Sequence, residues 1–267
     1  MTIQPFIKWA GGKRWLAEQV KELYDIAAPK RYIEPFLGGG AVFFSIRPRR
    51  AILSDVNGEL IEAYEVVRDS PAELLASLAE MHERHCETYY YATRGKSPDT
   101  KIQRAARFIY LNRTCWNGLY RVNQLGKFNV PIGTKNWVIQ DGEDFKENAA
   151  ALDCAILRCR DFSTTLAKAT TGDFVYIDPP YTVKHNKNGF LKYNDKIFSW
   201  KDQERLKKCA QRAADRGARV VISNADHESI RELYRDNFSI QVVSRFSKLA
   251  GDPLKRSKTT EVLISSI

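Results

Sequence analysis

The stretch RYIEPFLGGGAVFFSIRPRRAILSD, residues 31–55, contains the pattern that decides the fold. Residues 31–36 predict a short strand that runs into the loop Gly38-Gly39-Gly40, and residues 41–46 predict the start of a buried helix. Residues 50–55 predict a second strand that ends on an acid. A glycine loop at the N-terminus of a helix lets the backbone approach a ligand closely, at the positive end of the helix.

The acid that ends the second strand, Asp55, can accept hydrogen bonds from ribose hydroxyls. The order strand, glycine loop, helix, strand and acid therefore indicates half of a nucleoside-binding site. A dinucleotide fingerprint, G-x-G-x-x-G, would need glycine where this chain has Phe43, which argues against NAD.

Two more short β-branched runs, residues 174–178 and 219–224, predict further strands. The segment between them ends in a predicted helix with Ser199 as N-cap, Asp202 three residues later, and Gly217 as the C-terminal stop. Alternating strands and helices predict a mostly parallel sheet that is covered by helices.

The middle of the chain has a different pattern. It is helical from about 58 to 112, and Ser70-Pro71-Ala72-Glu73 predicts a capping box with proline in the first helical turn. Residues 112–133 are rich in Asn, Gly, Arg and aromatics, and predict a β-hairpin that turns near Gln124-Leu125-Gly126. We therefore expect an inserted, mainly helical domain over residues 61–149.

Composition limits the class of protein. The chain has 267 residues, of which 43% are hydrophobic, and no run of about 20 apolar residues that could cross a membrane. The net charge of +10 favours a polyanionic partner, most often nucleic acid. Five cysteines without a C-x-x-C pair favour a reducing, cytoplasmic location over a disulfide framework or a zinc site.

One cluster invites a metal interpretation. His82, His85 and Cys86 lie close together, and the two histidines could share a helix face. A solvated helix end is the better interpretation of this spacing, so we expect no metal.

The sequence YIDPPY, residues 176–181, places an acid, two prolines and an aromatic ring directly after a predicted strand. An exocyclic amine on a base is a poor nucleophile because its lone pair is delocalised into the ring. Two rigid acceptors, the Asp178 carboxylate and the Pro179 carbonyl, could hydrogen-bond both N–H groups and free that lone pair. Tyr181 offers a ring on which an extruded base can stack.

Several motifs, in order, resemble the Dam-type (D12 class) DNA adenine-N6 methyltransferases, and the resemblance covers essentially the whole chain. They are FIKWAGGKRWL (6–16), IEPFLGGGAVFF (33–44), LSDVN (53–57), the hairpin segment (112–133), RDF (160–162), YIDPPY and KTTEVLI (258–264). The resemblance implies a Rossmann-like α/β core that uses S-adenosylmethionine, formed by residues 1–60 and 150–267. Residues 61–149 would form the inserted DNA-recognition domain with its hairpin.

The family pattern also implies roles for residues. The catalytic block would be Asp178, Pro179, Pro180 and Tyr181. The cofactor residues would be Trp9, Ala10, Gly11, Gly12 and Lys13 at its methionine end, Glu34, Pro35, Phe36, Gly38 and Gly40 around its pocket, Asp55 and Asn57 near its ribose, Asp161 and Phe162 at its adenine, and Asp178 again. The sulfonium methyl is already electrophilic, so the reaction needs neither a protein nucleophile nor a metal.

The implied partner is double-stranded DNA, from which the target adenine would be flipped out. The implied recognition site is GATC or a related short sequence. The expected DNA-contacting residues are Arg113, Asn117, Arg121, Asn123 and Pro131, with Arg121 as the best candidate for a guanine contact. Backbone attraction could come from Arg94, Lys96, Lys101, Arg104 and the stretch from Lys184 to Lys192, although these could equally be solvated charges. A monomer is expected.

Three alternatives stay open at this level. Cytosine-N4 enzymes more often carry serine where this chain has Asp178, which favours adenine. Adenine methylation of RNA remains possible because single-stranded RNA also offers unstacked bases. A non-catalytic DNA-binding module on the same fold is disfavoured by the intact block at residues 178–181.

Overall fold

The computed structural model describes residues 3–123, 125–140, 142–184, 198–246 and 258–267. The chain forms two compact units. The first comprises Met1–Ala17, Gly38–Arg47 and Asp55–Cys159, and the second comprises Glu18–Leu37, Pro48–Ser54 and Arg160–Ile267. The sequence predicts a catalytic core over residues 1–60 and 150–267 and a DNA-recognition domain over residues 61–149. This assignment of functions to parts of the chain stays a prediction.

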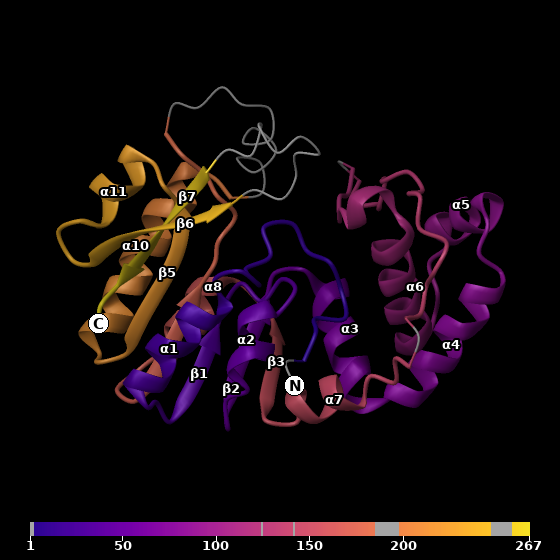
Figure 1. The fold of residues 1–267 in the computed structure, drawn as a ribbon, viewed down its shortest axis with the longest axis horizontal. Coiled ribbons are helices and arrows are strands. Elements are labelled where there is room, and N and C mark those ends of the chain that lie inside the picture. The colour runs from indigo at the N-terminus through magenta and orange to yellow at the C-terminus, as the bar shows by residue number, and fades with distance from the viewer. Residues whose placement is uncertain (1–2, 124, 141, 185–197, 247–257) are drawn as a thin grey trace. The chain divides into compact units, whose positions relative to one another are not determined.

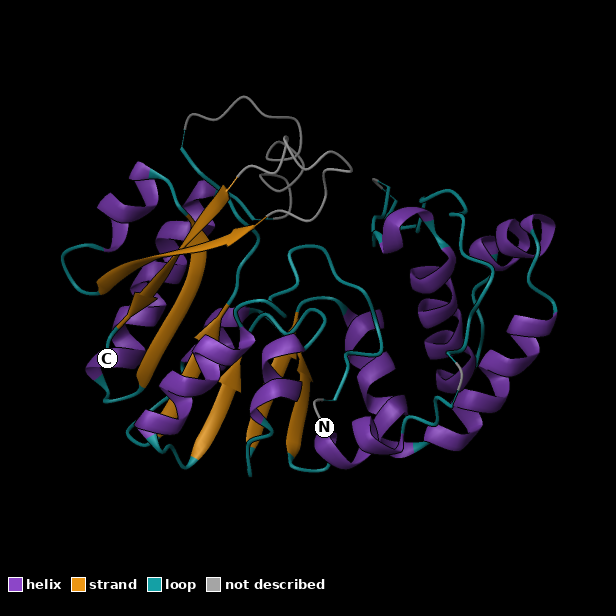
Figure 2. Cartoon of the chain, viewed as in Figure 1, coloured by secondary structure: helices purple, strands orange, loops and turns teal. Residues whose placement is uncertain are grey.

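The strands form a seven-stranded, mostly parallel sheet in the order β3-β2-β1-β4-β5-β7-β6 (Figures 1 and 2). Pairing is parallel from β1 to β2, from β1 to β4 and from β4 to β5, whereas β7 pairs antiparallel with β5 and with β6. The strands are β1 (Arg31–Glu34), β2 (Ala51–Asp55), β3 (Ala155–Cys159), β4 (Asp173–Ile177), β5 (Arg219–Ala225), β6 (Ser239–Phe246) and β7 (Lys258–Ser265). The strands predicted at residues 31–36, 50–55, 174–178, 219–224 and 258–264 are thus confirmed.

The helices connect these strands and form most of the middle of the chain. They are α1 (Ala17–Ala27), α2 (Ala41–Ile46), α3 (Gly58–Asp69), α4 (Pro71–Glu83), α5 (Glu87–Gly95), α6 (Lys101–Thr114), α7 (Lys146–Leu152), α8 (Phe162–Leu166), α10 (Trp200–Asp215) and α11 (Glu228–Tyr234), with a 3-10 turn at Trp116–Gly118. The helical pattern at 58–112 therefore resolves into four helices. Among the described residues, no helix combines the length and apolarity that a membrane span needs.

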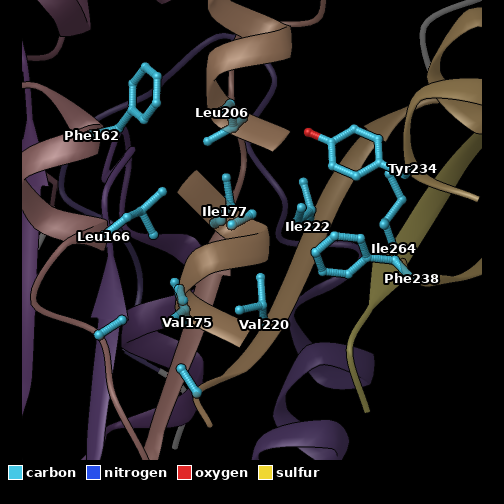
Figure 3. Close-up of a cluster of buried hydrophobic side chains, with 14 of the residues drawn as sticks. Phe162, Leu166, Val175, Ile177, Leu206, Val220, Ile222, Tyr234, Phe238 and Ile264 are labelled. Carbon is cyan, nitrogen blue, oxygen red and sulfur yellow. The ribbon is translucent and has the colours of Figure 1, made fainter. Parts of the chain in front are cut away.

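The core of the second unit lies between its sheet and the helices α10 and α11. Figure 3 shows Val175 and Ile177 of β4 beside Val220 and Ile222 of β5, with Leu206 of α10 above them. All of these side chains are fully buried. Burial on both faces explains why the parallel strands are continuously apolar rather than alternating.

The ends of α10 follow the sequence signals. The Ser199 hydroxyl accepts from the backbone N–H of Asp202, and the Asp202 carboxylate accepts from the N–H of Ser199, which completes a capping box. Gly217 beyond its C-terminus has φ +88°, a conformation that favours glycine. The capping box predicted at residues 70–73 is wrong, because Ser70 precedes α4 with φ −144° and ψ 54° and its side chain makes no cap hydrogen bond.

The predicted hairpin is present as a tight turn with short antiparallel pairing between its arms. Val122 pairs antiparallel with Phe128, and the N–H of Asn129 donates to the carbonyl of Arg121 at 3.1 Å. The Asn123 side chain accepts from the backbone N–H groups of Leu125 and Lys127, both at 3.0 Å, which closes the turn. Gln124, part of the predicted turn, lies outside the described residues.

Candidate active site

The block after β4 is held by a chain of hydroxyl groups. The Ser223 hydroxyl on β5 donates to the Asp178 carboxylate at 2.8 Å, and the Tyr176 hydroxyl lies 3.0 Å from the Ser223 oxygen. Because Ser223 has one proton and directs it to Asp178, Tyr176 must donate to Ser223. Burial and the Asp178 charge raise the pKa of Tyr176 well above its ordinary value, so this proton stays in place.

The aromatic residue of the block, Tyr181, is also fixed. Its hydroxyl donates to the carboxylate of Glu261 on β7 at 2.5 Å, and Glu261 is only 6% exposed. Burial, together with the charges of Asp178 and Glu261, raises the pKa of Tyr181 well above its ordinary value. Tyr181 is therefore a neutral donor with a set orientation. Pro179 is buried, and Pro180 is half-buried.

Residues 34–36 follow β1 in the same unit. Glu34 is buried and accepts from the Tyr32 hydroxyl at 2.9 Å. Pro35 is buried, whereas Phe36 is half-buried and stacks on Phe162 with ring centroids 5.3 Å apart. The acid at the end of β1 is thus held inside the protein, and Phe36 closes over the aromatic residue of the RDF motif.

Asp161 and Phe162 begin α8. Asp161 caps the helix by accepting from the N–H of Ser163 at 2.9 Å, and its carboxylate binds the Arg205 guanidinium at 2.7 and 3.0 Å. This ion pair, chiefly, lowers the pKa of Asp161 to about 2. Arg205 also lies 4.1 Å from the centre of the buried Phe162 ring. The Phe162 side chain is therefore part of the core, and only its backbone could reach a ligand.

The glycine loop and its acid lie in the first unit. The N–H of Gly38 donates to Asp55 at 3.1 Å, and the N–H of Asn57 donates to the other carboxylate oxygen at 3.0 Å. Asn57 also caps α3 through its side chain. Burial raises the pKa of Asp55, against the opposing effect of these backbone donors. Gly40 has φ +66°, and an added Cβ there would lie 2.7 Å from the Tyr64 hydroxyl, so glycine is required.

The segment from Trp9 to Lys13 forms a turn in which the N–H of Gly12 donates to the carbonyl of Trp9 at 3.2 Å. Gly11 has φ +79°, which explains a glycine there, and Ala10 is exposed. The Lys13 ammonium donates to the carbonyl of Gly11 at 2.7 Å, and Lys13 is 4% exposed. Lys13 therefore places a buried positive charge inside the turn and is not a solvated surface residue.

Four of the five expected DNA-contacting residues lie at the surface of the first unit. Asn117 and Asn123 are exposed, as is Pro131, and Arg121 is half-buried. The Arg121 Nε donates to the Asn129 side chain at 3.0 Å, which fixes one edge of its guanidinium.

The structure contradicts the expected DNA contact of Arg113. It is 6% exposed, and its guanidinium binds Glu143 through two hydrogen bonds at 2.5 and 2.6 Å and the carbonyl of Phe6 at 2.8 Å. A buried, fully engaged guanidinium is not available to DNA, so Arg113 stabilises the fold of the unit.

The basic residues expected to attract the DNA backbone also differ in whether they already have partners within the protein. Arg104 binds Glu62 through two hydrogen bonds, at 2.8 and 2.6 Å, and Lys101 pairs with Glu65 at 3.4 Å, so both attach α6 to α3. Arg94 donates to the carbonyl of Val130 at 3.1 Å, whereas Lys96 is exposed. The stretch from Lys184 to Lys192 lies outside the described residues except for Lys184, which is exposed.

The histidine cluster has structural partners. His82 Nδ1 accepts from the N–H of Val138 at 3.1 Å, His85 Nδ1 lies 2.8 Å from the Tyr110 hydroxyl, and Cys86 caps α5. Over the described residues, no group of three or more His, Cys, Asp or Glu side chains is arranged to hold a metal ion.

Sequence reasoning did not single out four residues that lie beside the predicted ones, Ser223, Glu261, Arg205 and Val56. Ser223 is a polar residue in the apolar run VVISN, and Glu261 is an acid inside KTTEVLI, so each carried a signal. Arg205 lies on the polar face of a helix, where nothing distinguishes it from its neighbours. Val56 is 64% exposed directly after Asp55, and the sequence carries no sign of that exposure.

The chain is similar to known proteins over most of its length. The family model for D12 class N6 adenine-specific DNA methyltransferase matches residues 9–249. A type II methyltransferase of Lactococcus lactis subsp. cremoris is 34% identical over 278 aligned residues, which cover 100% of this chain and 96% of that protein. The DNA adenine methylase of Escherichia coli (strain K12) is 32% identical and covers 97% of this chain and 93% of its own. The solved structure of TrmN from Thermus thermophilus is 11% identical with a TM-score of 0.42, over 95% of this chain and 49% of that one.

The ion pair between Arg205 and Asp161 predicts a measurable titration. In Arg205→Gln, the pKa of Asp161 should rise from about 2 toward its ordinary value, because the largest cause of the shift is removed. A folded-state pKa below the unfolded one means that the pair stabilises the protein above about pH 3.9. That contribution is lost as the pH falls through about 2. Carboxyl-carbon NMR on labelled aspartate tests this, and an unchanged Asp161 titration would contradict it.

The hydrogen bond between Tyr181 and Glu261 predicts a coupling in stability. A hydrogen bond to a charged group contributes about 1.5–3 kcal/mol. A double-mutant cycle of Tyr181→Phe and Glu261→Ala, measured by urea unfolding, should show a coupling of about that size. The exposed pair Lys146 and Asp144 is the matched control and should couple more weakly, because solvent screens it. Equal coupling in the two pairs would show that burial at Glu261 adds nothing.

Proposed function

We propose that this chain, which belongs to the D12 class N6 adenine-specific DNA methyltransferase family, transfers a methyl group from S-adenosylmethionine to the N6 amine of adenine in double-stranded DNA. One observation carries the proposal. The block at residues 178–181 directly follows β4, and hydrogen bonds from Ser223 and to Glu261 fix its acid and its aromatic ring.

The chemistry of the block follows from its rigidity. One N–H of the target amine would donate to the Asp178 carboxylate and the other to the Pro179 carbonyl, which localises the nitrogen lone pair. The Ser223 hydroxyl occupies one oxygen of Asp178, so the carboxylate is oriented before the base arrives. Acceptors that need no reorganisation stabilise developing positive charge on the amine most effectively. Tyr181, held by Glu261, would stack on the base.

The residues present fit the cofactor. The Asp55 carboxylate accepts two backbone N–H groups and, with about four lone-pair sites, can still accept ribose hydroxyls. Val56 offers an exposed apolar surface beside it, which an adenine ring would cover. We assign the turn from Trp9 to Lys13, with its buried ammonium, to the methionine end.

Two more groups complete this assignment. Asp161 would accept from the adenine amine, and the backbone N–H of Phe162, in the first turn of α8, would donate to the ring. Glu34, the last residue of β1, and Pro35 and Phe36, which follow it, would help to shape the cofactor pocket. When bound, the cofactor supplies an electrophilic methyl on its sulfonium, and the protein residues position the amine and exclude water.

Access to adenine in a duplex requires that the base is flipped out, because its amine is otherwise paired and stacked. We assign residues 61–149 to recognition of the site, which we propose to be GATC or a related short sequence. Arg121 would read a guanine edge with the N–H groups on the other edge of its guanidinium, since Asn129 accepts from Nε at 3.0 Å and from Nη2 at 3.4 Å. Asn117, Asn123 and Pro131 lie on the same segment and would contact DNA beside it.

The catalytic assignment predicts the behaviour of Asp178→Ala. Methyl transfer should fall by on the order of 100-fold or more because a preorganised acceptor is lost, while duplex binding stays within a few-fold. The assay incubates protein with unmethylated genomic DNA and S-adenosylmethionine, digests the DNA to nucleosides and measures N6-methyladenine by mass spectrometry. Asp236→Ala, at an exposed acid of the same unit, is the control. Methylated cytosine, or substantial turnover by Asp178→Ala, would refute the proposal.

The recognition assignment predicts that Arg121→Ala relaxes discrimination at one base pair. A bidentate contact to guanine contributes about 1–3 kcal/mol, so discrimination at that position should fall roughly 5- to 150-fold. Methylation rates on duplexes that carry single substitutions in the mapped site measure it. Lys127→Ala, an exposed residue of the same hairpin, should affect all duplexes equally. If Arg121→Ala behaves like Lys127→Ala, Arg121 does not read a base.

A further inference from the structure

Trp9 contacts both the glycine loop and the hairpin segment within the first unit. A Cβ at Gly38 would lie 2.8 Å from Cδ1 of Trp9, and one at Gly39 would lie 3.3 Å from its Cβ, so the loop packs directly on this side chain. The Trp9 ring also stacks on Tyr120, with centroids 5.4 Å apart and planes 22° apart. A displacement of the Trp9 ring would therefore also displace the Tyr120 ring.

Tyr120 is anchored at its other end to α3. Its hydroxyl donates to Glu59 at 2.8 Å, and Glu59 lies in the first turn of the helix that Asn57 caps. Arg107 on α6 lies 3.4 Å from the same carboxylate. Burial and the Glu59 charge raise the pKa of Tyr120, so the phenol stays protonated and keeps this bond.

The Tyr120 ring also contacts an aromatic residue of the hairpin. Its ring lies 5.8 Å from Phe128, which belongs to the returning arm, and 5.4 Å from Phe108 on α6. Arg121 is the next residue in the chain, and Phe128 precedes Asn129, the residue that holds its guanidinium. The orientation of the Tyr120 ring thus affects both residues that position the proposed guanine contact.

A second link fixes the backbone beside Trp9. The N–H of Lys8 donates to the Asn112 side chain at 2.9 Å, and the Asn112 amide donates to the carbonyl of Lys8 at 2.7 Å. Asn112 therefore holds the backbone at this point, while the Trp9 ring itself contacts Tyr120 and, with centroids 6.4 Å apart, Phe108.

We propose that Tyr120 is a positioning residue that couples cofactor binding at Trp9 to recognition of the DNA site at Arg121. The inference rests on the proposed function, because it takes Trp9 as part of the cofactor site. Coupling of this kind is reciprocal: bound DNA raises cofactor affinity by the same factor by which bound cofactor raises DNA affinity. Loss of the aromatic ring at residue 120 should lower that factor more than it lowers either affinity alone.

The test is a thermodynamic cycle with S-adenosylhomocysteine, which cannot donate a methyl group, and a duplex carrying the site mapped by the methylation assay. Calorimetry gives the Kd of S-adenosylhomocysteine for the free protein and for the DNA-bound protein. The ratio of the two should be on the order of 5- to 150-fold in the unmodified chain. It should fall close to 1 in Tyr120→Leu and be largely retained in Tyr120→Phe, which keeps the ring.

Two controls separate coupling from a purely structural role. Tyr91→Leu, at an exposed aromatic residue of the same unit, should leave the ratio unchanged. A purely structural role for Tyr120 would weaken both affinities and leave the ratio intact, and that result would overturn the inference. Tyr120→Met replaces Tyr120→Leu if the latter does not fold, because it removes the ring but fills the space.

The outcomes also separate this inference from the proposed function. If the unmodified chain binds neither S-adenosylhomocysteine nor the duplex, the proposed function itself fails. If it binds both with a ratio of 1, or if Tyr120→Leu keeps the ratio of the unmodified chain, the proposed function survives and the coupling through Tyr120 is refuted.

Discussion

The parallel pairing of β4 with β1 and with β5 is the constraint on which the block at residues 178–181 depends. Parallel strands end at the same edge of a sheet, so residues that follow different strands in the sequence share that edge. In this chain β1 ends on Glu34 and β4 is followed by Asp178. The register of β4 on β5 pairs Ile177 with Ile222, so Asp178 and Ser223 are the next residues on neighbouring strands. Their hydrogen bond is a consequence of sheet topology.

Most of the fold could be predicted because its signals are local. An apolar run of β-branched residues with a turn after it indicates a buried strand, and the capping residues at 199 and 217 mark the ends of α10. The false capping box at Ser70 shows the limit of such signals. Pro71 follows Ser70, and the observed ψ of 54° does not direct the serine hydroxyl to the helix N–H groups. Sequence spacing permits the bond, but backbone conformation decides it.

The site was less predictable because its residues acquire their properties from partners distant in sequence. Arg113 and Arg121 are both arginines of one short segment, yet Glu143 binds the first in the interior while Asn129 fixes only one edge of the second. Glu143 and Asn129 are ordinary residues in the sequence. The same holds for Lys13, whose charge is enclosed by its own turn rather than solvated. Residue type indicates which chemistry is available, and burial determines whether a ligand can use it.

The aromatic contacts of the first unit give a reason why the N-terminal block belongs with the hairpin segment. Residues 1–17 and 55–159 form one compact unit, although the block resembles a cofactor-binding motif and the segment a DNA-reading one. A cofactor motif that packed only on the sheet would bind its ligand independently of DNA. Because Trp9 packs on Tyr120, a change in the conformation of the N-terminal block would alter that of the hairpin segment, and the reverse also holds. Stacked rings suit this purpose, because their interaction depends on geometry more steeply than hydrophobic burial does.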